Sequence, residues 1–243
     1  MGVGVLPRAL ANATWFGRSV GVALLALTAS TAVGQSSTSS SKSSSPSQDL
    51  TEHVTVDWSA GVMVAKAVGL ADRRAPAPDV ARAAARSRGV TQARAHLRAA
   101  LLLVPWANGK TSTEQLSAAE LETLVAAATL GRAQPQTDGG WHIELQLPVE
   151  VVRQAVQGNR KRAVDGDDMV PPAIALDARK LSVLPAVGMR VNDGGATVEC
   201  AMRWVTRWPG ASIKVSHVTA GQLAVSKPVG IKPATLCVII VSQ

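Results

Sequence analysis

The chain has 243 residues, 47% of them hydrophobic, and a formal net charge of +8 at pH 7. That length allows one large domain or two small ones, with enough apolar material for a packed core. The excess charge could favour binding to lipid headgroups, wall polymers or nucleic acid. Because the basic residues are scattered, we interpret it instead as a solvated surface. Because there is no tyrosine and the one phenylalanine lies near the N-terminus, the core must rely on aliphatic side chains and tryptophan. The tryptophans beyond the N-terminal segment are Trp58, Trp106, Trp141, Trp204 and Trp208.

Residues 1–34 have the three parts of a secretory signal peptide. Two arginines and no acid precede the apolar run 20–27, and small residues follow up to Gly34. The run is shorter than the roughly 20 apolar residues that a membrane span requires. We therefore predict cleavage after Gly34 and a protein that is periplasmic or associated with the outer membrane.

Residues 35–52 are rich in serine and contain almost no apolar side chains. This composition predicts a disordered linker, which buries too little apolar surface to offset its ordering entropy. A folded α+β domain is expected over residues 53–157. It opens with two β-rich runs, 54–58 and 62–68, around Gly61, and this pattern predicts a hairpin.

A long helix is predicted from Asp79, as the N-cap, to about Leu103. Small residues recur on it every four positions and line one face. They should let the backbone pack closely against a sheet, a neighbouring helix or a partner. This helix packing stripe consists of Ala81, Ala85, Gly89, Ala93 and Leu97.

Ser117 and Glu120 form a capping-box pattern that starts a second helix, to about Leu130. A strand is expected around residues 132–136, and the alternation over 141–147 predicts a half-buried strand. Pro148 should open a short helix to Val156. The expected fold class is α+β: an antiparallel sheet with two main helices packed on one face, followed by a small β-rich C-terminal domain.

Residues 158–172 are charged, contain glycine and end in two prolines, which predicts a linker. The β-rich C-terminal domain should then cover residues 173–243, where short β-like runs alternate with turns. Cys200 and Cys237 lie in two of these runs. In an oxidising compartment an even count favours a disulfide, and two buried free thiols are the alternative.

Two stretches resemble a known family. The first comprises 61–65 and 78–82 with Ala85, Ala93 and Leu97, and its closing strand is 140–148. The second is Ala175–Leu181 with its continuation to Val191. Together with 229–233 they are similar to bacterial envelope lipoproteins of the FlgP-like and Lpp types, which include flagellum-associated proteins and surface antigens. The chain lacks the lipobox cysteine of that family. The resemblance implies a structural or assembly role in the envelope, and it implies no catalytic residue.

No pattern in the chain indicates catalysis. The histidines are far apart in sequence, and none has metal-ligand spacing to another ligand type. We therefore predict no catalytic, cofactor-binding or metal-binding residues, no cofactor and no enzymatic activity. Trp204, Arg207 and Trp208 form a tryptophan–arginine cluster, which would serve either as a partner-binding surface or as the edge of the core.

The sequence thus favours an exported structural or assembly protein of the cell envelope that acts by protein–protein contact. Its partners would be envelope proteins or a second copy of itself, with peripheral membrane or cell-wall contact and without a membrane span or nucleic acid. The stripe and the edges of the β-rich domain are the expected docking surfaces. The alternative is a periplasmic binding or sensing module for an anionic envelope ligand.

Overall fold

A computed structural model describes residues 45–110, 112–157, 173–219, 221–232 and 235–242. The predicted signal peptide, most of the predicted linker 35–52 and the predicted linker 158–172 lie outside the described residues. The described residues all belong to one compact unit, Lys42–Gln243. The helices are α1 (Pro78–Leu101), α2 (Ser112–Gln115), α3 (Ala118–Ala127) and α4 (Val149–Gln157).

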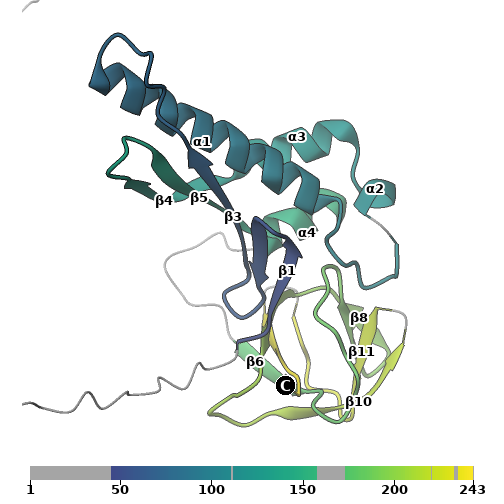
Figure 1. Cartoon of the computed structure of the whole chain (residues 1–243). Helices are drawn as coiled ribbons and strands as arrows, with labels where there is room; N and C mark the ends of the chain where they lie inside the picture. Colours follow the sequence, from purple (N-terminus) through teal and green to yellow (C-terminus); the bar gives the residue numbers. More distant parts are fainter. Residues whose placement is uncertain (1–44, 111, 158–172, 220, 233–234, 243) are drawn as a thin grey trace, which may run out of the picture. The chain divides into compact units, whose positions relative to one another are not determined.

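The strands form two sheets, as the α+β class requires (Figure 1). Those of the first sheet are β1 (Ser47–Thr51), β2 (Val54–Asp57), β3 (Val62–Gly69), β4 (Thr129–Pro135) and β5 (Trp141–Pro148). Those of the second sheet are β6 (Ala173–Asp177), β7 (Arg190–Asp193), β8 (Ala196–Val198), β9 (Ala201–Val205), β10 (Ile213–Thr219), β11 (Gln222–Val225) and β12 (Leu236–Ile240).

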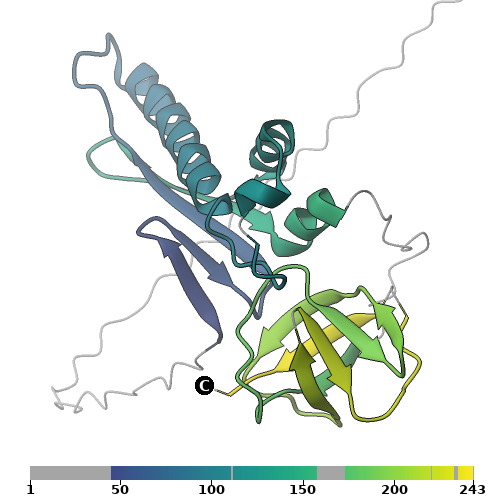
Figure 2. The same cartoon turned by 90° about the vertical axis from the view of Figure 1, so that its right-hand side faces the viewer.

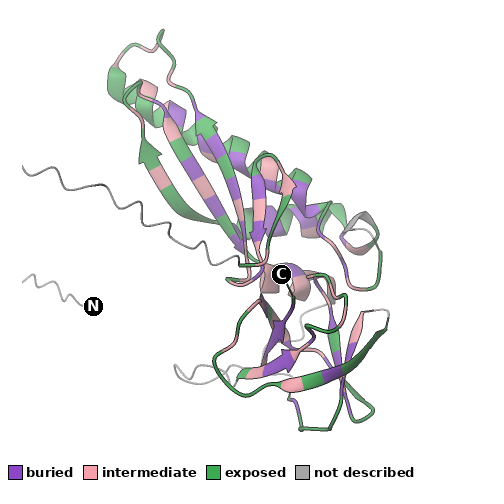
Figure 3. Ribbon diagram, turned by 60° about the horizontal axis from the view of Figure 1, so that its bottom comes forward, coloured by how far each residue is buried: buried purple, intermediate pink, exposed green. Residues whose placement is uncertain are grey.

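The first sheet is antiparallel in the order β1-β2-β3-β5-β4, with α1 packed on β3 and β5. Buried residues alternate with more exposed ones along β3 and β5 (Figure 3). One face of the sheet therefore carries the buried apolar side chains. The predicted hairpin is the β2–β3 pair, whose turn contains Gly61 at φ 66°. These observations confirm the predicted antiparallel sheet and its helices.

Helix α1 approaches the sheet closely at two glycines. A Cβ atom on Gly89 would lie 2.7 Å from Cγ1 of Ile143 on β5, and Gly69 lies directly beneath the helix backbone. Ala85, Gly89 and Ala93 are buried in this contact. The predicted stripe therefore packs against the sheet of its own chain. This close packing explains the presence of Gly89, although a glycine in the middle of a helix costs about 1 kcal/mol relative to alanine.

The second sheet is mixed, in the order β8-β7-β11-β10-β6-β12-β9 (Figure 2). The C-terminal strand β12 pairs in parallel with both β6 and β9. Four of its five residues are buried, as expected for an apolar strand in a sheet interior. The region after residue 173 is thus rich in strands, as predicted.

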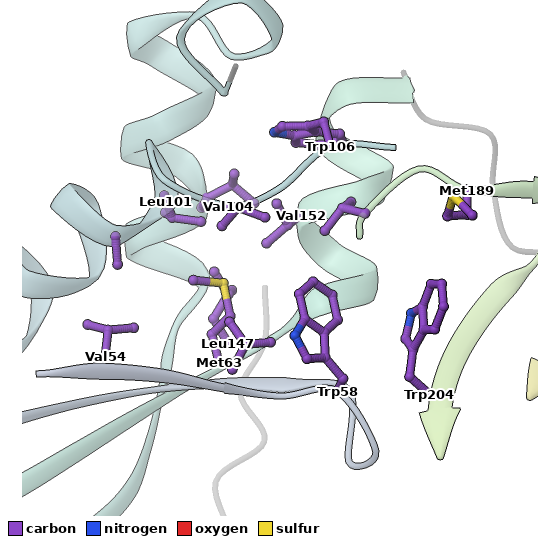
Figure 4. Close-up of a cluster of buried hydrophobic side chains, with 14 of the residues drawn as sticks. Val54, Trp58, Met63, Leu101, Val104, Trp106, Leu147, Val152, Met189 and Trp204 are labelled. Atoms are coloured by element: carbon purple, nitrogen blue, oxygen red, sulfur yellow. The ribbon is translucent and has the colours of Figure 1, made fainter. Parts of the chain in front are cut away.

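Buried side chains from both sheets form one hydrophobic cluster. Trp58, at the end of β2, lies beside Trp204 on β9 in this cluster (Figure 4). The Trp204 amide donates a hydrogen bond to the Trp58 carbonyl oxygen at 3.1 Å. Trp106 is buried as well, whereas Trp141 and Trp208 are only partly buried, so three of the five tryptophans carry the core.

Three local predictions were wrong. Ser47–Thr51 is a strand rather than linker, because pairing with β2 and a 2.7 Å hydrogen bond from the Thr55 hydroxyl to the Asp49 carboxylate order this polar segment. Asp79 does not cap α1, since Ala77 is the N-cap and Pro78 takes the first helical position. Pro148 ends β5 instead of opening α4.

Candidate functional site

Among the described residues, no group of three or more histidine, cysteine, aspartate or glutamate side chains is arranged to hold a metal ion. Two histidines that the sequence separates do meet: the rings of His53 and His96 stack with centroids 4.0 Å apart. Nδ1 of His96 lies 2.8 Å from the carbonyl oxygen of Lys66, which ties the stack to β3.

The helix packing stripe is not a docking surface. Ala85, Gly89, Ala93 and Leu97 are buried against the first sheet, and Ala81 is partly buried. The expectation that a partner docks on this stripe is therefore wrong, because the chain itself covers it. No helix in the described part of the chain is long and apolar enough to cross a membrane.

The tryptophan–arginine cluster is divided between core and surface. Trp204 is only 1% exposed, so it belongs to the core and its placement in an interface was wrong. Arg207 is exposed and Trp208 is partly buried, beyond the end of β9. The alternation of a strand explains the burial of Trp204 between two more exposed neighbours.

Asp177 and Arg179 form a local pair at the end of β6. Two nitrogens of the guanidinium donate to the two carboxylate oxygens, at 2.9 and 2.7 Å. This hydrogen bonding lowers the pKa of Asp177 from 3.8 to about 2. The guanidinium and the carboxylate neutralise each other, and the pair stabilises the turn that follows β6.

Cys200 and Cys237 form a disulfide, with Cα atoms 6.1 Å apart, and both residues are fully buried. The bridge links the segment before β9 to β12, beneath the parallel pairing of those strands. The predicted pairing is thus confirmed, and it is typical of proteins that fold in an oxidising compartment.

A buried carboxylate fixes the loop before β12. Asp193 accepts hydrogen bonds from the amides of Val229, at 2.8 Å, and Ile231, at 2.7 Å. Burial alone would raise the pKa of Asp193, but these backbone hydrogen bonds outweigh it and lower the pKa. The ionised carboxylate of Asp193 therefore holds this loop in place.

An apolar groove of about 280 Å³ runs beside the edge strand β1. It is lined by Pro46, Ser47, Gln48, Trp58, Pro105, Leu184 and Pro185, and we call it the β1 groove. Leu184 is 82% exposed and adds an apolar side chain to the lining of the groove. Trp58 is only 2% exposed, and its indole Nε1 has no hydrogen-bond partner among the described residues.

A polar cavity of about 300 Å³ lies where the loop after α1 meets the second sheet. Its lining includes Trp106, Asn108 and Gln115 from the segment after α1, and Arg190, Glu199 and Gln222 from the second sheet and its connections. The walls are joined by backbone hydrogen bonds: Ala107 donates to Val187, and Val187 donates to Pro105, both at 2.9 Å. These backbone hydrogen bonds therefore fix the positions of the segments that line the cavity.

The charges around the polar cavity are balanced. Nε of Arg190 lies 3.4 Å from a carboxylate oxygen of Glu199. Arg153 donates two hydrogen bonds to Glu150, at 2.8 and 2.6 Å. Its pKa is raised by the hydrogen bonding to Glu150 and further by the charges of Glu150 and Glu199. Of these two pairs, Arg190 and Glu199 line the polar cavity, whereas Arg153 and Glu150 line a neighbouring pocket.

No family model matches the chain, and no curated protein matches it. The resemblance to envelope lipoproteins accordingly stays a prediction. Sequence reasoning missed the β1 groove and the polar cavity, because their lining residues come from segments far apart in the chain. The exposure of Leu184, which marks the groove, is visible in the structure and not in the sequence.

Proposed function

We propose that the protein is an exported component of the cell envelope that acts by protein–protein contact, without catalysis. Residues 1–34 have the pattern of a signal peptide, and the buried disulfide suits a compartment outside the cytoplasm. On the basis of its resemblance to FlgP-like and Lpp-type proteins, we propose that it belongs to an outer-membrane or flagellum-associated assembly.

The observation that carries this proposal is the β1 groove. A strongly exposed leucine beside prolines and a tryptophan offers apolar area that water covers in the isolated chain. Burial of one leucine side chain contributes about 1.5–3 kcal/mol, so a partner that fills the groove gains substantially. The groove is concave and mostly apolar, which is the character of many binding sites.

The neighbouring strand suggests how the partner binds. β1 is at the edge of the first sheet, and among the described residues no strand pairs with its outer side. An extended segment could add to this edge and place alternate side chains in the β1 groove. We therefore propose an extended, apolar segment of another envelope protein as the occupant.

The test compares two exposed leucines by fractionation of cells that make the protein. Leu184→Asp should weaken attachment to the envelope fraction at least about tenfold, because it removes the apolar contact and adds a charge that must be desolvated. Leu70→Asp is the matched control, since Leu70 is 65% exposed but does not line the groove. Equal attachment of both variants would contradict the proposal.

A second candidate function is binding of an anionic envelope polymer to α1. Because the stripe faces the sheet, the arginines of α1 are exposed. Three already have partners: Arg98 pairs with Glu122, Arg88 donates to the Leu70 carbonyl, and Arg86 lies over the ring of Trp141. A salt titration separates the candidates, because electrostatic capture weakens steeply with salt and apolar docking does not.

A further inference from the structure

We infer that the polar cavity between Trp106 and Gln222 is a binding site for a neutral saccharide unit. This site is separate from the β1 groove, and the inference does not depend on the proposed function. It rests on the size of the cavity, the chemistry of its lining and the rigidity of its walls.

The volume limits the ligand to a small molecule. Ligand-binding pockets commonly measure about 300–1,000 Å³, and this cavity, at about 300 Å³, is at the lower end. A single sugar ring is of the appropriate size, and the exposed Asn108 at the border of the cavity leaves room for a glycosidic chain to continue outward.

The lining suits hydroxyl groups. The amides of Gln115 and Gln222 each offer donors and an acceptor. Asn108 offers its NH₂ donors, because its Oδ1 already accepts a hydrogen bond from the Lys110 amide at 3.0 Å. Arg190 donates and Glu199 accepts. A sugar hydroxyl is also both donor and acceptor, so a ring with several hydroxyls can satisfy such a mixed set. Trp106 and Val187 add an apolar wall for the C–H face of the ring.

The electrostatics favour a neutral ligand over an anion. Arg190 is the cation that lines the cavity, and its Nε already lies 3.4 Å from a carboxylate oxygen of Glu199. An anionic ligand would have to compete with this carboxylate for the guanidinium group of Arg190. A neutral ligand can hydrogen-bond to both side chains without breaking their ion pair.

The walls are held in place before any ligand binds. The backbone amide of Arg190 donates a hydrogen bond to the carbonyl oxygen of Gly221 at 2.9 Å. A parallel β-bridge between Trp106 and Val187 fixes another part of the lining. A Cβ atom on Gly221 would lie 2.9 Å from the carbonyl oxygen of Ala107, so the two walls touch. Such preorganisation lowers the ordering cost of binding.

The experiment is calorimetric titration of the full secreted chain with triacetylchitotriose and, separately, with maltotriose. We expect a dissociation constant in the micromolar to millimolar range for at least one of the two saccharides. This constant should change less than twofold between low and high salt. Gln222→Ala should weaken that binding at least tenfold, and Asn108→Ala, which changes an exposed loop residue, should weaken it severalfold. Gln134→Ala, on the exposed edge strand β4, is the matched control and should bind as the unmodified chain does.

Absence of binding to both saccharides at millimolar concentration would overturn the inference. So would binding that Gln222→Ala and Asn108→Ala leave intact, because it would place the ligand elsewhere. Binding only of anionic glycans, lost with added salt, would also overturn it and would favour the arginines of α1. Loss of envelope attachment in Leu184→Asp with saccharide binding retained would separate this site from the β1 groove.

Discussion

Replacing Gly69 with alanine tests the closest approach between α1 and the first sheet. A Cβ atom at this position would overlap the backbone carbonyl oxygen of Ala85 and lie 2.8 Å from the amide nitrogen of Gly89. Overpacking costs about 1–3 kcal/mol where side chains can shift. Here the obstacle is helix backbone, so α1 must move as a whole, and we expect a loss of more than about 3 kcal/mol.

Gly89→Ala provides the internal comparison, because two effects oppose each other there. Alanine gains about 1 kcal/mol in helix propensity, but its Cβ atom would lie 2.7 Å from Cγ1 of the buried Ile143. With overpacking at about 1–3 kcal/mol, the packing effect wins and the net loss should be about 1 kcal/mol. Ala99→Gly, at an exposed position of the same helix, measures the propensity contribution alone.

The assay is urea unfolding followed by circular dichroism. With a slope of about 2 kcal/mol per molar urea, Gly69→Ala should lower the midpoint by about 1.5 M and Gly89→Ala by about 0.5 M. A midpoint for Gly69→Ala equal to that of the unmodified chain would refute the reasoning, because it would mean that the helix does not pack on β3 at this point.

Three further predictions concern stability. The double variant Cys200→Ala/Cys237→Ala should lose about 4 kcal/mol, since the bridge spans a sequence separation of 37 residues; a calorimetric loss below about 1 kcal/mol would speak against a bridge in the folded protein. Ser117→Ala should cost about 1 kcal/mol in urea unfolding, because it removes the observed capping box of α3, and an unchanged midpoint would show that the cap contributes nothing. The hydrogen bonds from Arg179 lower the pKa of Asp177 from 3.8 to about 2, so their contribution is complete above about pH 4 and is lost as the pH falls toward 2. Asp177→Asn should flatten that part of the stability profile, and an identical acid limb would contradict the assignment.

The sequence was most informative where structure depends on local periodicity. The spacing of Ala85, Gly89 and Ala93 predicted the packed face of α1, and the serine and glutamate of the capping box predicted the start of α3. Alternation predicted β5. Each of these features is encoded within one helix or one strand, so the spacing of residues close in sequence is enough to predict it.

Features that depend on distant pairing were missed. Ser47–Thr51 is too polar to predict a strand, and it becomes one because β2 supplies a partner. Trp204 has arginine and other polar neighbours in sequence, yet it is buried beside Trp58, which lies far away in the chain. The polar cavity combines Trp106 with Gln222 for the same reason. No local pattern could have identified these contacts.

The most direct test of contact at the β1 groove is site-specific photo-crosslinking from position 184 in intact cells. A photoreactive residue in place of Leu184 should yield a discrete adduct with another protein in the envelope fraction, whereas the same residue at position 70 should yield none. The account would be contradicted if position 184 gave no adduct while the protein was folded and disulfide-bonded, or if the protein was recovered from the cytosol with Met1 still attached.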